Sequence, residues 1–238
     1  MIIVIIVILV ILAFVYMKLY MNMKKKDVED ILNNQELDKM AVDLIDNVSI
    51  CEQILKMLNV ENVNVKLNPD KTSGNSFFNT FSREIILCNN DKVNRSYTRV
   101  LYIAHECVHA MQKQAYLKFN FIFANINMLF CIISTILVWF NVIKEPIYLG
   151  ILAITLILNM FSFFARNVIE SDATYMSVLV AKEFLEKFLP KENVETIISK
   201  YKQIISNGYS TFSFSLFTTN LSFIFIQVIS MLVCTYIY

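Results

Sequence analysis

FIFANINMLFCIISTILVWFNVI, which covers residues 121–143, and IYLGILAITLILNMFSFFA, which covers residues 147–165, decide the fold of this chain. Neither stretch contains Asp, Glu, Lys, Arg or His, and only three residues separate the two. A helix of about twenty apolar residues spans the roughly 30 Å hydrocarbon layer of a bilayer. The two stretches therefore predict a pair of membrane helices joined by a tight turn at Lys144-Glu145-Pro146.

Two further apolar stretches lie near the ends of the chain. Residues 213–237 carry no charged side chain, and residues 2–17 are almost wholly aliphatic. The stretch at 2–17 extends to about residue 21 if Lys18 reaches up to the interface. A cleaved signal peptide is the alternative there, but the basic residues follow the stretch instead of preceding it, which favours an uncleaved anchor. We therefore expect four transmembrane helices.

The charges indicate how the chain is oriented. The formal net charge is only +1, which gives no reason to expect a nucleic-acid partner. Twenty of the 21 Lys and Arg residues lie between the first and second or between the third and fourth predicted spans. The positive-inside rule places these segments in the cytoplasm, so that both termini face the exterior of the cell membrane. The five cysteines form no CxxC pair, and unpaired thiols are typical of a reducing compartment.

The four spans divide the chain into five regions. They are a transmembrane anchor at 1–21, a cytoplasmic α+β region at 22–118, a transmembrane hairpin at 119–166, a cytoplasmic helical region at 167–212 and a transmembrane helix at 213–238.

Within the cytoplasmic regions the hydrophobic pattern predicts helices and a small sheet. Residues 27–58 carry apolar side chains at helical spacing, whereas residues 60–67 (VENVNVKL) alternate with period two. The segment Ser82–Cys88 predicts a second short strand. The next helix continues to about Ala115 and leads almost without interruption into the second span. The pattern at residues 180–205 predicts one or two helices, with a break at Pro190.

The helix before the membrane hairpin contains both histidines of the chain. His105-Glu106-Cys107-Val108-His109 is an HExxH motif. Because residues i and i+4 share one helix face, both imidazoles can bind one metal ion, and Glu106 can reach a water on that ion. Cys107 lies on a different face and is a poor ligand candidate. The motif predicts a zinc site with His105 and His109 as ligands and Glu106 as general base.

The third ligand must come from elsewhere. Catalytic zinc commonly takes three protein ligands and keeps a fourth position open. There is no third histidine, and the hairpin returns the chain at Arg166, so Glu170 comes back near the level of the histidine helix. Glu170 is the predicted ligand and Asp172 the alternative, since i and i+2 lie about 200° apart on a helix. Both carboxylates could instead stabilise the N-terminus of a helix leaving the membrane.

Such a site would hydrolyse peptide bonds. Zinc polarises the scissile carbonyl and lowers the pKa of water, while Glu106 takes the water's proton and passes it to the leaving amine. Arg166, Tyr116 and Tyr175 are the candidate oxyanion donors. The strand at 82–88 could bind an extended peptide by edge pairing.

Taken together, these motifs resemble the YugP-type family of small integral-membrane neutral zinc metallopeptidases over nearly the whole chain. The segments that carry the resemblance are Ala104-His105-Glu106-Cys107 with His109-Ala110 and Gln112, and Ile169-Glu170-Ser171-Asp172-Ala173. The resemblance implies that His105, His109 and Glu170 bind zinc and that Glu106 is the catalytic base. Val108 departs from the family, which usually has glycine there, and leaves the ligands untouched.

The sequence as a whole predicts a mainly α multi-pass membrane protein, with four transmembrane helices and a small α+β zincin-like domain at the cytoplasmic membrane surface. Its predicted function is that of a Zn²⁺-dependent metalloendopeptidase, whose partners are the lipid bilayer and membrane-associated protein substrates. A CAAX-type or quality-control membrane protease is the closest enzymatic competitor. An intramembrane protease is disfavoured, because polar residues flank the motif on both sides.

Two readings from other classes remain as alternatives. A non-catalytic zinc-binding scaffold or sensor would need a fourth protein ligand. A transporter is disfavoured because the last three spans contain no charged residue. The polar residues of those spans are instead interpreted as groups that hydrogen-bond between helices: Asn125, Asn127, Asn159, Thr218, Thr219 and Asn220.

Overall fold

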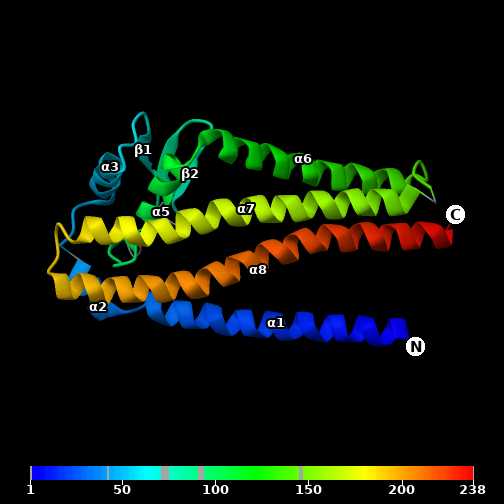
Figure 1. Cartoon of the computed structure of the whole chain (residues 1–238), viewed down its shortest axis with the longest axis horizontal. Coiled ribbons are helices and arrows are strands. Elements are labelled where there is room, and N and C mark those ends of the chain that lie inside the picture. The colour runs from blue at the N-terminus through cyan, green and yellow to red at the C-terminus, as the bar shows by residue number, and fades with distance from the viewer. Residues whose placement is uncertain (1, 42, 71–74, 91–93, 145–146, 238) are drawn as a thin grey trace. The chain divides into compact units, whose positions relative to one another are not determined.

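The computed structural model describes residues 2–41, 43–70, 75–90, 94–144 and 147–237 (Figure 1). Helices dominate this part of the chain. The elements are, in chain order, α1 (Ile2–Leu32), α2 (Gln35–Ala41), α3 (Asn47–Met57), β1 (Asn64–Leu67), β2 (Phe77–Asn79), β3 (Glu84–Leu87), α5 (Arg99–Met111), α6 (Gln114–Trp139), α7 (Ile147–Leu185) and α8 (Lys191–Ile237). The predicted mainly helical fold with a small sheet is confirmed.

The sheet has three strands in the order β1-β3-β2, with β1 parallel and β2 antiparallel to β3. The two predicted strands correspond to β1 and β3, whereas β2 was not predicted. Because β3 is the central strand, both of its edges are already paired. The prediction that the strand at 82–88 binds a peptide by edge pairing is therefore wrong, and the open edges belong to β1 and β2.

Contacts divide the chain into two compact units, of which the first comprises the chain up to Met111 together with Ala173–Phe214. Its core is formed by α3, α5, the last turns of α7 and the first turns of α8. The side chains of Ile54, Val108 and Phe184 are completely buried in it. Burial of such side chains, at about 1.5–3 kcal/mol each, is the main stabilising term for this unit.

The second unit comprises Gln112–Asp172 together with the chain from Ser215 onward. The helices α6, α7 and α8 are each long and apolar enough to cross a membrane, which supports a membrane protein. For the predicted first span, α1 is helical from Ile2, but the side chains of residues 2–14 lie outside the described part of the chain. The first span therefore stays a prediction. Glu145 and Pro146 of the predicted turn also lie outside the described residues.

Polar side chains connect the helices of the second unit. The hydrogen-bonded pairs are Asn127–Asn159 at 3.2 Å, Gln227–Ser134 at 2.6 Å and Trp139–Ser230 at 3.1 Å. The interhelical role predicted for Asn127 and Asn159 is confirmed. Among the described residues the other four donate to backbone carbonyls of their own helices instead: Asn125, Thr218, Thr219 and Asn220.

Some helices are longer than predicted and one is shorter. The third span and the segment that carries Glu170 form one helix, α7, because no glycine or proline interrupts residues 151–185. Likewise α8 starts directly after Pro190, as predicted, and then continues without a break into the last span. The histidine helix is shorter than predicted. It ends at Met111, and α6 begins at Gln114, because Lys113 is in an extended conformation with ψ 113°.

Candidate metal centre

The two histidines lie one turn apart on α5, whose opposite face is buried in the core of the first unit. Their Nε2 atoms are 3.1 Å apart, and their rings meet edge to face at 89° with centroids 4.6 Å apart. Two nitrogens bound to one tetrahedral zinc at about 2.05 Å are about 3.3 Å from each other. The imidazole pair is therefore already spaced for a shared metal ion. His109 is 9% exposed, so its orientation is fixed by packing.

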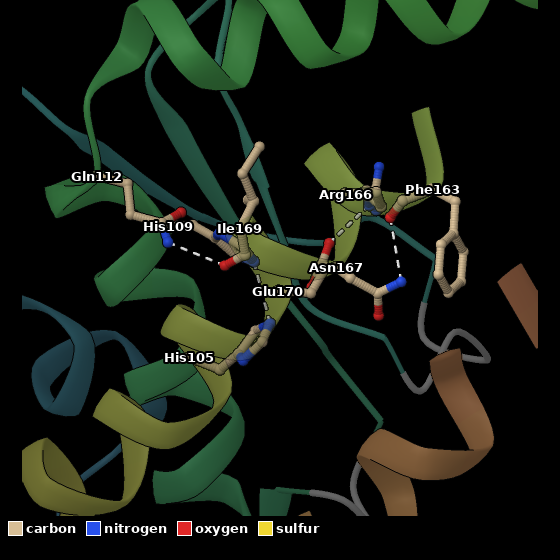
Figure 2. A network of polar contacts seen from close by, with 8 residues as sticks. All are labelled: His105, His109, Gln112, Phe163, Arg166, Asn167, Ile169 and Glu170. Carbon is tan, nitrogen blue, oxygen red and sulfur yellow. Dashed lines mark hydrogen bonds and ion pairs between the residues drawn. The ribbon is translucent and has the colours of Figure 1, made fainter. Parts of the chain in front are cut away.

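Glu170 completes the group. One ligand atom from each of His105, His109 and Glu170 lies within 4.8 Å of the other two (Figure 2). The three predicted ligands are thus brought together, and they form a group that could hold a metal ion. Glu170 lies in the middle of α7, less than one turn before Ala173, which is completely buried in the core of the first unit.

An arginine on α7 holds the Glu170 carboxylate. Arg166 Nε is 2.9 Å from Glu170 Oε1, and the Glu170 side chain is only 14% exposed (Figure 2). Arg166 was one of the predicted oxyanion donors, but here it contacts the carboxylate instead. An ion pair at this spacing restricts the rotamer of the glutamate.

The other two candidate oxyanion donors make different contacts. Tyr116 is 63% exposed and lies under the Lys113 ammonium, which is 5.7 Å from the ring centroid. Tyr175 packs against Tyr209 with ring centroids 6.0 Å apart. Neither contact indicates a role as an oxyanion donor.

Asp172, the alternative third ligand, is bound elsewhere. Gln112 Nε2 donates to Asp172 Oδ2 and to the Ile169 carbonyl oxygen, both at 2.9 Å. Asp172 is not part of the group formed with the histidines. The predicted choice of Glu170 over Asp172 agrees with this arrangement. The idea that these carboxylates stabilise a helix N-terminus is wrong, because α7 begins far upstream at Ile147.

Gln112 belongs to the sequence motif around the histidines, and its hydrogen bonds show that it also has a structural role. Its side chain ties the segment between α5 and α6 to the turn of α7 that carries Glu170. The residue also stands at the break between these two helices. Sequence alone could not reveal this contact, because its partners lie 57 and 60 positions away.

Cys107, which the sequence indicates is a poor ligand candidate, lies on the face of α5 that packs into the core. Its side chain is completely buried on the core side of α5, and its Sγ lies 3.5 Å from Cys51 Sγ on α3. Burial, together with the neighbouring Cys51 thiol, raises the pKa of the Cys107 thiol well above its ordinary value. A thiol held neutral in this way is a poor metal ligand.

Glu106 is half-buried and lines a cavity of about 450 Å³ in the first unit. The other lining residues come from the end of α1, the start of α3, the segment before β2, the end of β3, the segment before α5 and the same face of α5. They are Leu32, Asn33, Asn47, Asn75, Ser76, Cys88, Ser96, Thr98, Arg99, Tyr102 and Ile103. Glu106, next to the two histidines of the candidate site, therefore borders a space large enough for part of a peptide.

No protein-family model, no curated protein and no solved structure matches this chain. The family resemblance accordingly stays a prediction, and the function is argued from the geometry of the site.

Proposed function

We propose that this chain is a membrane-embedded zinc metalloendopeptidase in which His105, His109 and Glu170 hold the metal. The observation that carries the proposal is the convergence of these three side chains, with Glu106 directly following His105. Two imidazoles and a carboxylate are a donor set found in catalytic zinc sites, which keep one position open. The resemblance to the YugP-type peptidases points to the same activity.

The residues present fit a zinc ion. The donors are two nitrogens and one oxygen, the nitrogens are 3.1 Å apart, and the three ligand atoms lie within 4.8 Å. Zinc bound there would supply a Lewis acid that polarises a scissile carbonyl and lowers the pKa of a water molecule.

The chain's own residues would carry out the remaining chemistry. Glu106 would accept a proton from the attacking water at its carboxylate and deliver it to the nitrogen of the leaving amine. Arg166 would keep Glu170 oriented, so that the carboxylate does not rotate away from the imidazoles. The cavity beside Glu106 would bind part of the substrate and exclude bulk water from it.

We also place this activity at the cytoplasmic face of the cell membrane. The three apolar helices support a membrane location, and the Lys- and Arg-rich segments favour the cytoplasmic side. Substrates would then be proteins that lie in or near the bilayer.

The test uses the full chain, purified in detergent and loaded with zinc, with an unfolded protein as substrate. Glu106→Gln should lower kcat by at least a hundredfold, the scale of a lost general base, while zinc content stays at one ion per chain. Glu183→Gln is the matched control, because this substitution makes the same chemical change at an exposed position of α7. Cleavage that survives Glu106→Gln or chelation would contradict the proposal. Stable zinc binding without any cleavage would favour the scaffold or sensor.

A further inference from the structure

Arg99 is the first residue of α5, and its charge is deeply buried. The side chain is 6% exposed. Nη2 donates to the carbonyl oxygens of Leu44 at 2.9 Å and Ala41 at 3.3 Å, and Nη1 donates to Asn47 Oδ1 at 3.2 Å. Nε is buried and has no hydrogen-bond partner among the described residues. Three of the five donors of the guanidinium are therefore used, all of them by neutral acceptors.

The Asp46 carboxylate acts on Arg99 electrostatically from a distance, but no carboxylate among the described residues forms an ion pair in contact with it. Burial lowers the pKa of this guanidinium, although an arginine remains protonated at any physiological pH. A buried charge without a counter-ion is unfavourable, and proteins usually pair it. Arg99 thus lies in a setting that an added anion would stabilise.

Arg99 and Glu106 line the same cavity. They lie seven residues apart on one face of α5, which corresponds to a rise of about 10.5 Å along the helix axis. The polar side chains between and around them are neutral amides and hydroxyls. Those groups are Asn33, Asn47, Asn75, Ser76, Ser96 and Thr98. Among the described residues of this lining, Arg99 is the one cation and Glu106 the one carboxylate.

We propose that this cavity binds a carboxylate of the peptide substrate at the Arg99 end, with the scissile bond at the Glu106 end. The inference rests on the proposed peptidase function and adds a substrate class to it. An extended peptide advances about 3.3–3.6 Å per residue, so the carboxylate lies within about three residues of the cleaved bond. It is either an Asp or Glu side chain or the C-terminus of the substrate.

The first measurement needs no variant. Wild-type protein is given matched fluorogenic peptides in which Glu replaces Gln at each position within three residues of the cleaved bond. A second pair differs only in a free or an amidated C-terminus. We expect one carboxylate to raise kcat/KM by about tenfold, the scale of a charge-assisted hydrogen bond. A Glu preference identifies a side-chain carboxylate, and a preference for the free acid identifies the chain terminus. Equal cleavage of all acid and amide pairs would overturn the inference while leaving the peptidase assignment intact.

The second measurement assigns the preference to Arg99. In Arg99→Gln the ratio of kcat/KM for the acid peptide to kcat/KM for the amide peptide should fall to near one. Arg95→Gln is the matched control, because Arg95 is an exposed arginine four residues earlier that does not line the cavity. Arg99→Lys retains the charge and should keep part of the preference, which covers the case in which Arg99→Gln does not fold. A preference unchanged in Arg99→Gln would overturn the assignment.

A binding assay separates this inference from the proposed function. Glu106→Gln protein is titrated with the labelled acid and amide peptides, and fluorescence anisotropy gives each Kd without any need for turnover. Tighter binding of the acid peptide, lost in the double variant with Arg99→Gln, supports the carboxylate site even if the protein cleaves nothing. Equal Kd values for the two peptides contradict it.

Discussion

In the second unit the hydrogen bonds between helices are made by neutral side chains, as in the pair Asn127–Asn159, whereas the three side chains that could hold a metal ion, His105, His109 and Glu170, are all ionisable. The physical reason is the cost of desolvation. A neutral amide in an apolar helix bundle is satisfied by one partner, but a charge there needs a counter-ion or a metal. The difference indicates that the first kind of polar group serves packing and the second kind serves chemistry.

The largest expected effect comes from removing a metal ligand. Glu170→Gln should weaken zinc binding by on the order of a hundredfold or more, because an anionic donor is lost, whereas Asp172→Asn should change it by less than about tenfold. The measurement is a competition titration of each purified variant against a zinc chelator of known affinity. If Asp172→Asn were the more damaging change, the third ligand would be misassigned.

A smaller effect is expected when the partner of that ligand is removed. Arg166→Ala should weaken zinc binding by about 10–100-fold, since partners that orient metal ligands typically contribute that much. Arg166→Lys should restore part of the loss as a point charge. Lys182→Ala is the control, because Lys182 near the end of α7 forms the same i,i+4 type of ion pair with Glu186, at 3.7 Å. Equal zinc affinities of Arg166→Ala and Lys182→Ala would rule out a positioning role for Arg166.

These parts of the molecule were not equally predictable. The HExxH pair was recognisable because its spacing acts within a single helix. β1 was recognisable from alternation, and β3 from a short apolar run. β2 was missed because three residues are too short to show a period. Helix continuity through α7 was also missed, because hydropathy marks where a helix leaves the apolar layer and not where it ends. The contacts of Arg99 join residues more than fifty positions apart, and no local pattern carries such information.

A charged group in the first unit should also affect stability without affecting zinc. Asp46 is the N-cap of α3 and accepts hydrogen bonds from Ser49 Oγ and from the backbone N–H groups of Val48 and Ser49. The Ser49 hydroxyl and then its N–H lower the pKa of Asp46 below the ordinary value of 3.8. Asp46→Ala should lower the free energy of unfolding by about 1 kcal/mol, the usual effect of losing such a cap.

The pH dependence of that cap follows from the direction of the shift. A carboxyl with a lowered pKa in the folded state stabilises that state above its unfolded pKa and loses this contribution as the pH falls through the folded pKa. The difference between wild type and Asp46→Ala should therefore be constant near neutral pH and shrink below about pH 4. Pulse proteolysis of both proteins in detergent from pH 3 to 7 measures it, and an increase of the difference at low pH would contradict the assignment.

The smallest expected effect is in the second unit and involves no charge. A double-mutant cycle of Asn127→Ala and Asn159→Ala should give a coupling energy of about 0.6 kcal/mol, the average for hydrogen bonds between membrane helices. Trp139 is the one tryptophan of the chain and lies in this unit, so its fluorescence reports unfolding of the second unit in mixed micelles. Zinc affinity should be unchanged in all three variants, because neutral groups that serve packing supply no ligand. A coupling above about 2 kcal/mol, or zinc loss in any of the three, would mean that this pair is tied to the metal centre and that the contrast between packing and chemistry does not hold.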